Sequence, residues 1–237
     1  MAASSDITLA IETSNPSAWT PASPIKPGVV VAADRGQTLL ARADIDPQAV
    51  HQDQLMSSIA AAMSVAGIAP RQLSTVAVSV GPGGYTAVRL GVTVAKIIAE
   101  VTGAACKAVP TAHAIVRATA PRVPCAVALA SKGTTAFLTR FDAAGVEQEP
   151  GLLCTAAWIE SAAIEVLIAD AFLPESFANA CKERGIRIMP PVFDALHVAQ
   201  VAAGLAAVDP LSLAAFYPRE PEAVTKWKQL KQGTKPA

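Results

Sequence analysis

The residues best suited to chemistry form a glycine-rich segment, Gly81-Pro82-Gly83-Gly84-Tyr85-Thr86, between an apolar run and an amphipathic stretch. Glycines at a strand-to-helix turn let the backbone turn tightly, and the free N–H groups of the following helix can bind an anion. The segment lacks the Lys-Ser or Lys-Thr of a P-loop and does not follow the G-x-G-x-x-G spacing. Two interpretations stay open for Gly81, Gly83, Gly84 and Thr86, a structural turn and an anion site.

A second candidate is the short loop Glu12-Thr13-Ser14, which follows an apolar run at Ile7–Ile11. Glu12 stands beside a strand end, where a carboxylate could serve an acid–base or phosphate-binding loop. The same carboxylate could instead accept hydrogen bonds from neighbouring backbone N–H groups and have no chemical role.

Hydrolytic and metal chemistry find little support in the sequence. His51, His113 and His197 are far apart, no H-E-x-x-H pair exists, and no G-x-S-x-G elbow is present. The four cysteines have no C-x-x-C spacing and are expected to be reduced, buried thiols: Cys106, Cys125, Cys154 and Cys181. We therefore expect no metal site in this chain.

The elements that must position these residues alternate between strands and helices. Apolar runs at Ile7–Ile11, Gly28–Ala33 and Gln37–Ile45 predict a three-stranded meander, and the prolines of Asn15–Gly28 predict an exposed loop. A helix is expected from Asp46-Pro47 to Gly67, because aspartate followed by proline is a helix-start signal. A buried strand at Leu73–Val80 then leads through the glycine-rich turn into a second helix ending at Gly103. The residues on its apolar face are Ala87, Leu90, Gly91, Val94, Ala95, Ile98 and Val101.

The second half of the chain repeats the α/β alternation. The patterns predict helices at Thr111–Ala120, Ala156–Ser161, Ser176–Arg184 and Asp194–Val208, and β segments at Cys125–Ala130, Thr135–Phe141, Glu147–Cys154, Glu165–Ile168 and Ile186–Met189. The residues from Arg219 onward are expected to form a solvated, modestly basic tail. Two similar α/β lobes are the simplest architecture for this order, with mixed sheets flanked by helices.

Composition narrows the class of protein further. The chain has 237 residues, of which 52% are hydrophobic and 16% charged, so it can bury a substantial core and is not disordered. Nineteen lysine and arginine residues balance nineteen aspartate and glutamate residues, which leaves no global positive field to attract nucleic acid. No membrane span or secretory signal is recognisable, so a cytoplasmic protein is expected.

Three segments resemble one known family. They are Ala10–Ser14 after the first strand, His51 four residues before Leu55-Met56, and Gly81–Gly91 running into Ala95-Lys96. Phe216-Tyr217-Pro218-Arg219, followed by Lys226-Trp227-Lys228, is similar to the family's ending. Together these segments resemble the TsaB (YeaZ) family, a Gcp-like, glycoprotease M22-like group. Its members are non-catalytic subunits in bacterial synthesis of tRNA threonylcarbamoyladenosine.

The chain also departs from that family's pattern. Glu12 stands where the family usually has Asp, and the proline-rich stretch Asn15–Pro27 replaces a short hairpin. Gly84-Tyr85-Thr86-Ala87 replaces most of a Gly-Ser-Phe-Thr-Gly sequence, and Ala130-Ser131-Lys132-Gly133 replaces an Asp-Ala-Arg-like turn. If these loops once bound a nucleotide or anion, the departures indicate that the site is vestigial.

The resemblance implies a two-lobed, actin-like (ribonuclease H-like) fold, with lobes at residues 1–109 and 110–237 and the last segment packing back on the first lobe. It implies that the N-terminal lobe binds a TsaD homologue, with TsaE, that ATP and metal belong to those partners, and that tRNA is reached only through the complex. A homodimer is expected when the chain is alone, since an exposed apolar patch tends to be covered. Helix residues that should divide between the core and the partner interface are His51, Leu55, Met56, Ile59, Met63, Leu90, Val94 and Ile98.

Two other functions remain as alternatives. The first is an ATP-dependent small-molecule kinase of the same superfamily, which would use the Glu12 loop and the Gly81 turn as phosphate loops. The second is a glycoprotease-type peptidase, although no metal pair or nucleophile is recognisable in the sequence.

Overall fold

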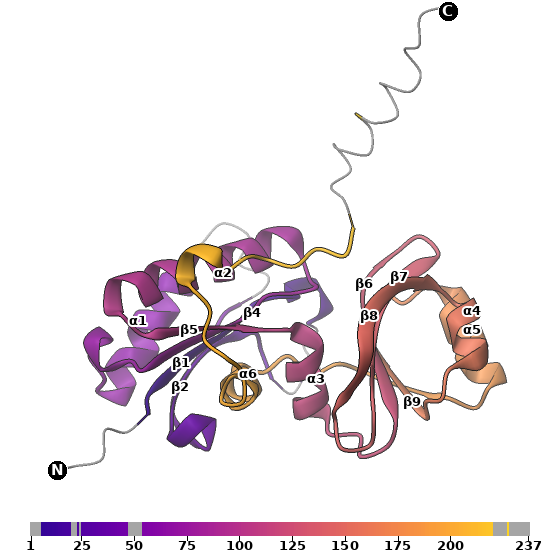
Figure 1. Ribbon diagram of the computed structural model, residues 1–237, viewed down its shortest axis with the longest axis horizontal. Helices are drawn as coiled ribbons and strands as arrows, with labels where there is room; N and C mark the ends of the chain where they lie inside the picture. The colour runs from indigo at the N-terminus through magenta and orange to yellow at the C-terminus, as the bar shows by residue number, and fades with distance from the viewer. Residues whose placement is uncertain (1–5, 20–22, 24, 47–53, 220–226, 228–237) are drawn as a thin grey trace, which may run out of the picture.

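The computed structural model describes residues 6–19, 23, 25–46, 54–219 and 227. Its described part contains two five-stranded mixed sheets, each flanked by helices (Figure 1). The strand orders are β3-β2-β1-β4-β5 in the first sheet and β10-β9-β6-β7-β8 in the second. This arrangement confirms the predicted α/β class with mixed sheets.

The first sheet begins as the expected meander. β1 (Thr8–Glu12), β2 (Gly28–Ala33) and β3 (Thr38–Asp44) pair antiparallel in sequence order, and β4 (Thr75–Ser79) and β5 (Ala105–Val109) continue the sheet parallel to β1. Every residue of β1, β2 and β4 is buried, so both faces of the sheet's centre must be covered.

Helices supply that cover on both faces. α1 (Leu55–Ala66) and α2 (Tyr85–Thr102) lie on one face, where Leu9 and Ile11 of β1 join their core. α6 (Ala195–Ala202) lies on the opposite face with Ala10 of β1. Because successive strand residues point to opposite faces, this alternation places α1 and α2 together on the same side of the first sheet.

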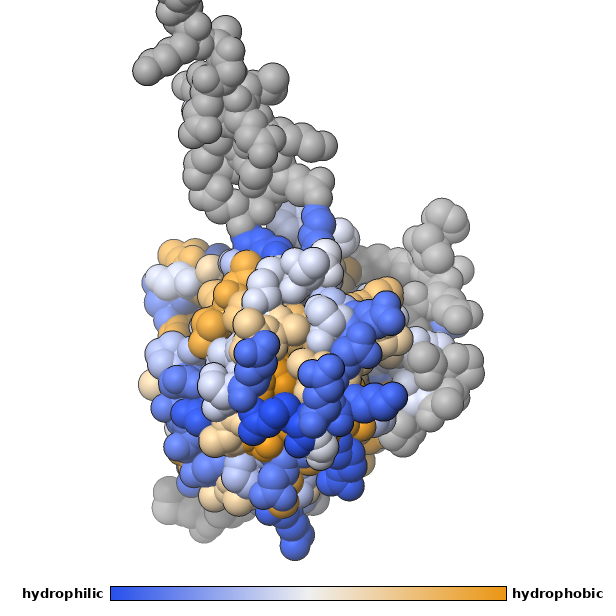
Figure 2. All heavy atoms as spheres, turned by 90° about the vertical axis from the view of Figure 1, so that its right-hand side faces the viewer, coloured by the Kyte–Doolittle hydropathy of each residue, from blue (hydrophilic) through white to orange (hydrophobic). Residues whose placement is uncertain are grey.

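The second sheet has the same layered design. Its strands are β6 (Cys125–Lys132), β7 (Thr135–Phe141), β8 (Glu147–Thr155), β9 (Val166–Ala169) and β10 (Arg187–Met189). α4 (Ala157–Ser161) and α5 (Glu175–Glu183) cover one face, and α3 (Thr111–Thr119) packs on the other through Ile115. The end of this lobe is seen in Figure 2, where polar residues surround smaller apolar areas.

Three local predictions need correction. The last helix ends at Ala202 and not at Val208, because Lys107 and Arg35 cap the carbonyls of Ala202 and Ala203 and Val208 pairs with Cys106 instead. α1 begins at Leu55, and residues 47–53 of the expected longer helix lie outside the described part.

The third correction concerns the proline-rich loop, which was expected to be exposed. Asn15 donates a hydrogen bond to Asp170 at 3.2 Å, and Ala18 packs against the core of the second sheet. The loop therefore contacts the second half of the chain. The pattern of prolines and small residues in the loop has no periodicity that would predict this contact.

The segment after α6 returns to the first sheet. Leu213 is buried in the α1/α2 core, and the Phe216 N–H donates to the Val80 carbonyl at 2.7 Å. The boundary between lobes at residue 109 stays a prediction about folding units. Among the described residues, no helix combines the length and the apolar character that crossing a membrane requires.

Candidate functional site

The glycine-rich turn is brought beside the Glu12 loop because β1 and β4 are parallel neighbours. The Gly84 N–H donates to the Ser14 carbonyl at 2.7 Å. A Cβ at Gly83 would collide with that same carbonyl oxygen, and a Cβ at Gly81 would lie 2.6 Å from the Phe216 carbonyl oxygen. The glycines are thus required by close approach of the protein's own backbone. A carbonyl oxygen, which repels anions, occupies the space beside the turn.

Glu12 is fully buried, and both oxygens of its carboxylate accept hydrogen bonds from neighbouring residues. One carboxylate oxygen accepts hydrogen bonds from the Ser14 N–H at 2.8 Å and the Ser14 hydroxyl at 2.7 Å, and the other accepts from the Ser79 hydroxyl. Burial raises the pKa of Glu12, although the hydrogen bonds from Ser79 and Ser14 act in the opposite direction. The geometry favours the structural interpretation of this carboxylate over acid–base chemistry.

The remaining residues of the two loops also serve packing. The Thr13 hydroxyl donates to the Ala87 carbonyl of α2 at 3.4 Å, and a Cβ at Gly91 would lie 2.9 Å from the Thr13 oxygen. Thr86 is exposed in the first turn of α2. The structure therefore brings the predicted loop residues together, but their contacts pack the end of β1 against α2 and do not form an open site.

The free energy of unfolding of a Glu12→Gln variant is expected to rise relative to that of wild type as the pH increases. The pKa of Glu12 in the folded protein lies above its ordinary value of 4.5, so its favourable contribution is complete below that pH and is lost as pH rises through the folded pKa. Glutamine keeps the shape, can still accept from Ser14, and is never charged. Urea denaturation of both proteins between pH 4.5 and 8 measures the difference, and a gap that stays constant or narrows with rising pH would contradict the prediction.

A second buried cluster was not anticipated from the sequence. Asp194 caps the N-terminus of α6, accepting from the Leu196 N–H at 3.0 Å, and it pairs with Arg42 of β3 at 2.6 Å and with His197 Nδ1 at 2.9 Å. The sequence offered one local indication of this cluster, because Asp194 stands at an N-cap position three residues before His197. The contact with Arg42 joins α6 to the first sheet.

The Asp194–His197 pair resembles the acid–base half of a catalytic triad, but it lacks a nucleophile. Within the described part of the chain, no serine, threonine or cysteine is hydrogen-bonded to His197. A triad needs a nucleophile within hydrogen-bond reach of the base. The cluster is explained as a clamp that docks α6 on β3.

An Asp194→Asn variant tests this clamp through acid stability. Burial raises the pKa of Asp194, but hydrogen bonds from His197 and Leu196 and the charge of Arg42 outweigh it and lower the pKa from 3.8 to about 2. A lowered carboxylate pKa contributes stability that is present above about pH 4 and is lost toward pH 2, here about 2 kcal/mol. Urea denaturation between pH 2.5 and 6 should show wild type losing this increment while Asp194→Asn, which keeps an N-cap, does not. Parallel acid profiles for the two proteins would refute the clamp.

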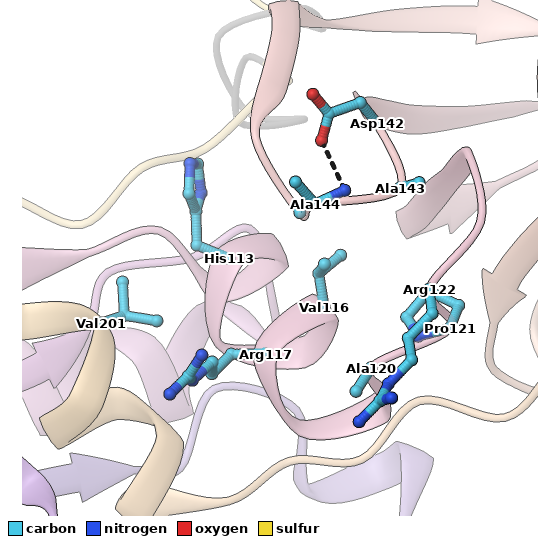
Figure 3. Close-up of a pocket in the computed structure, with 11 residues that line it drawn as sticks. His113, Val116, Arg117, Ala120, Pro121, Arg122, Asp142, Ala143, Ala144 and Val201 are labelled. Atoms are coloured by element: carbon cyan, nitrogen blue, oxygen red, sulfur yellow. Dashed lines mark hydrogen bonds between the residues drawn. The ribbon is translucent and has the colours of Figure 1, made fainter.

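A pocket of about 430 Å³ lies between α3, the β7–β8 turn and α6 (Figure 3). Asp142 in its wall accepts hydrogen bonds from the N–H groups of Ala144 and Val146, both at 2.9 Å, so its carboxylate serves its own turn. His113 pairs with Glu147 at 3.1 Å, and burial lowers the pKa of His113 despite this partner. The Arg117 Nε donates to Gln200 at 3.1 Å. Structural contacts thus account for Asp142 and Arg117, and Glu147 takes up one ring nitrogen of His113, whose buried Nδ1 has no hydrogen-bond partner among the described residues.

In the part of the chain that the structure describes, the cysteines are isolated thiols and do not cluster with acidic residues. All four cysteines are free, and burial raises the pKa of Cys125 and of Cys154 to about 11, which keeps them as thiols. No group of three or more His, Cys, Asp or Glu side chains in the described residues is arranged to hold a metal ion.

The exposed faces of α1 and α2 are chemically unusual. α1 contains no charged residue, and its outer face consists of small or apolar side chains: Met56, Ser57, Ala60, Ala61, Ser64 and Val65. On α2, Leu90, Ile97 and Val101 are exposed, with Ile97 at 57% and Val101 at 80%. Both helices cover the same face of the first sheet, and we call these residues together the α1/α2 surface.

The eight residues expected to divide between core and interface lie in different places. Leu55, Ile59, Met63 and Val94 are buried in the first lobe's own core, and Ile98 is partly buried against it. Met56 and Leu90 are exposed, and His51 lies outside the described residues.

Three exposed residues were missed or misplaced by the sequence pattern. Val65 and Ile97 were not named, and Val101 was placed on the apolar face of α2 but was not among the candidate interface residues. α2 carries two apolar stripes, and the buried one runs through Val88, Gly91, Val92, Val94, Ala95 and Ala99. The helical spacing of Leu90, Ile97 and Val101 was the available signal for the outer stripe.

Comparisons with known proteins agree with this architecture. Residues 46–153 match the family described as TsaD, tRNA N6-adenosine threonylcarbamoyltransferase. YeaZ from Pseudomonas aeruginosa has a similar structure, with a TM-score of 0.66 and 15% identity, covering 90% of this chain and 99% of that one. A protein described as uncharacterized, with similarity to peptidase YeaZ from Pseudomonas aeruginosa, matches with a TM-score of 0.67 and 16% identity, covering 90% of this chain and 100% of that one. A search of curated proteins by sequence found no match.

The two mixed sheets with their helical layers define a two-lobed α/β protein with the actin-like, ribonuclease H-like fold of the YeaZ structures. Within this class, residues 46–153 are similar to the TsaD family, a match that covers less than half of the chain, and the whole fold is similar to that of the YeaZ structures.

Proposed function

We propose that this chain is a non-catalytic scaffold and activator subunit. It binds a TsaD homologue through the N-terminal lobe and, with TsaE, supports transfer of a threonylcarbamoyl group to adenosine in ANN-decoding tRNA. The observation that carries the proposal is the α1/α2 surface, which is apolar, exposed and, on α1, without a charged residue.

The composition of the α1/α2 surface suits a protein partner. The cores of protein interfaces are depleted in charged residues and bury apolar side chains. Small residues such as Ala60, Ala61 and Ser64 let a partner helix approach closely, while Met56 can adapt its shape to the contact. A second copy of the chain would cover the same surface when the partner is absent.

The internal contacts of the candidate loops fit a role without chemistry of its own. Ser14 fills the space beside the glycine-rich turn, and Ser14 and Ser79 take up both oxygens of Glu12. The kinase alternative would need these loops to receive phosphates, and the peptidase alternative would need a nucleophile beside His197. In this proposal ATP and metal are handled by the partners, and tRNA is reached through the complex.

Co-expression with the TsaD homologue from the same genome tests the proposal. We expect a stable complex by size-exclusion chromatography with light scattering, and threonylcarbamoylation of tRNA that requires this chain together with TsaD and TsaE. Failure of the folded chain to bind that homologue would contradict the proposal. Tight, magnesium-dependent ATP binding to the isolated chain in calorimetry would favour the kinase alternative.

A further inference from the structure

A short C-terminal segment, Phe216–Arg219, crosses from the first sheet to the second. Figure 1 shows the chain before and through this segment, in orange to yellow, running along α2 toward the second lobe. We call residues 216–219 the strap. Its two ends contact different sheets, and each end makes specific polar contacts.

The first end of the strap is attached beside the glycine-rich turn. The Phe216 N–H donates to the Val80 carbonyl at 2.7 Å, and Gly81 has no side chain where the Phe216 carbonyl passes. The Tyr217 hydroxyl donates to the Tyr85 carbonyl at the start of α2 at 3.1 Å, and the two tyrosine rings lie 4.9 Å apart. Backbone, ring and hydroxyl contacts thus hold the strap to the first lobe.

The other end of the strap is attached to the β6–β7 hairpin. The Arg219 guanidinium donates to the Ala130 carbonyl at 3.2 Å, to the Thr135 carbonyl at 3.1 Å and to the Thr135 hydroxyl at 2.6 Å. The Phe216 ring also meets the Phe137 ring edge-on at 5.4 Å. A guanidinium has several fixed donors, so it can bind a set of oxygens that a single ammonium would not span.

The hairpin is shaped to receive this guanidinium. The register of β6 and β7 shifts between Leu129 and Lys132, and Ala130 has a left-handed φ of 50° within that irregularity. A bulge leaves its extra residues outside the ladder and redirects their groups. Ala130 therefore lies at the irregularity in the ladder, and its carbonyl accepts a hydrogen bond from Arg219.

We propose that the strap is a latch that sets the orientation of the two lobes relative to each other. Arg219 is its releasable part, because the hydrogen bonds of its guanidinium go to the second lobe, while the Phe216 N–H and the Tyr217 hydroxyl anchor the strap to the first. The latch is independent of any partner, since it lies within one chain.

Residual dipolar couplings of the full-length isolated chain test the latch. In wild type, amide couplings from both sheets should fit one alignment tensor on the present structure. In the Arg219→Ala variant, and more strongly in a Phe216→Ala, Arg219→Ala double variant, the two sheets should require different tensors. A single shared tensor in both variants would overturn the proposal.

Arg184→Ala is the matched control. Arg184 also bonds to backbone carbonyls, those of Ile159, Glu160 and Ala162, but it joins parts of the second lobe only. Its loss should leave a single tensor, and if it separates the lobes equally the effect of Arg219 is not specific to the latch. As a second readout, hydrogen exchange of the Phe216 amide should become at least about tenfold faster in Arg219→Ala, consistent with local opening. Unchanged protection of that amide would also count against the latch.

Discussion

An Ile97→Asp substitution should weaken the proposed binding of the TsaD homologue by about 100-fold or more. Ile97 is 57% exposed at the middle of the outer stripe of α2, so the substitution does not disturb the core of the free protein. In a complex, the aspartate carboxylate would be buried against apolar groups with no hydrogen-bond or ion-pair partner, and this burial costs several kcal/mol. A loss of about 2.7 kcal/mol corresponds to 100-fold in dissociation constant, within the range of interface hot spots. Calorimetric titration with the purified partner measures the change.

Val146→Asp is the control for this experiment. Val146 is also 57% exposed and apolar, but it lies by the β7–β8 turn, away from the α1/α2 surface. Both variants should unfold within about 0.5 kcal/mol of wild type, as surface substitutions usually do. Wild-type affinity for Ile97→Asp, or equal losses for the two variants, would place the partner on another surface.

A Gly83→Ala substitution is expected to destabilise the protein by about 3 kcal/mol or more. Its Cβ would overlap the Ser14 carbonyl and lie 3.0 Å from a Val88 methyl group, and the backbone carbonyl cannot move without breaking its bond from Gly84. Chemical denaturation monitored by circular dichroism measures the loss.

Gly84→Ala separates this steric effect from a general intolerance of the turn. A Cβ at Gly84 would lie 3.7 Å from the Ser14 carbonyl, an ordinary contact distance, and the Gly84 φ of −65° suits any residue. Its effect should stay below about 1 kcal/mol. If Gly83→Ala is as stable as Gly84→Ala, the turn is open and the anion-site interpretation recovers.

Local chemistry was enough to predict most of the elements. The meander of β1, β2 and β3 follows from short apolar runs separated by turn formers, and Gly67 and Gly103 end α1 and α2 in left-handed conformations, as expected for C-terminal glycines. The α/β order led to the two-sheet class because alternating elements bury their apolar faces best in layers.

Elements whose ends depend on distant contacts were predicted less well. α6 stops at Ala202, where the ammonium of Lys107, 95 residues earlier in the chain, donates a hydrogen bond to the Ala202 carbonyl. The proline-rich loop packs on the second lobe through Asn15 and its partner Asp170, 155 residues away. The spacing of apolar residues reflects structure over only a few residues, so it does not predict contacts between distant parts of the chain.

Some features of the candidate site could likewise be predicted from the sequence, and others could not. The residue pattern alone was enough to predict the α/β order, the strand-to-helix turn at Gly81–Thr86, the lack of metal and hydrolase motifs, and the apolar character of α1 and α2. The packing of the folded chain was needed to show that Ser14 closes the turn, that Asp194 clamps α6 to Arg42, and that Ile97 and Val101 face outward. The reason is physical: a helix with two apolar stripes satisfies the same periodicity whichever stripe is buried, and the sheet it packs on makes the choice.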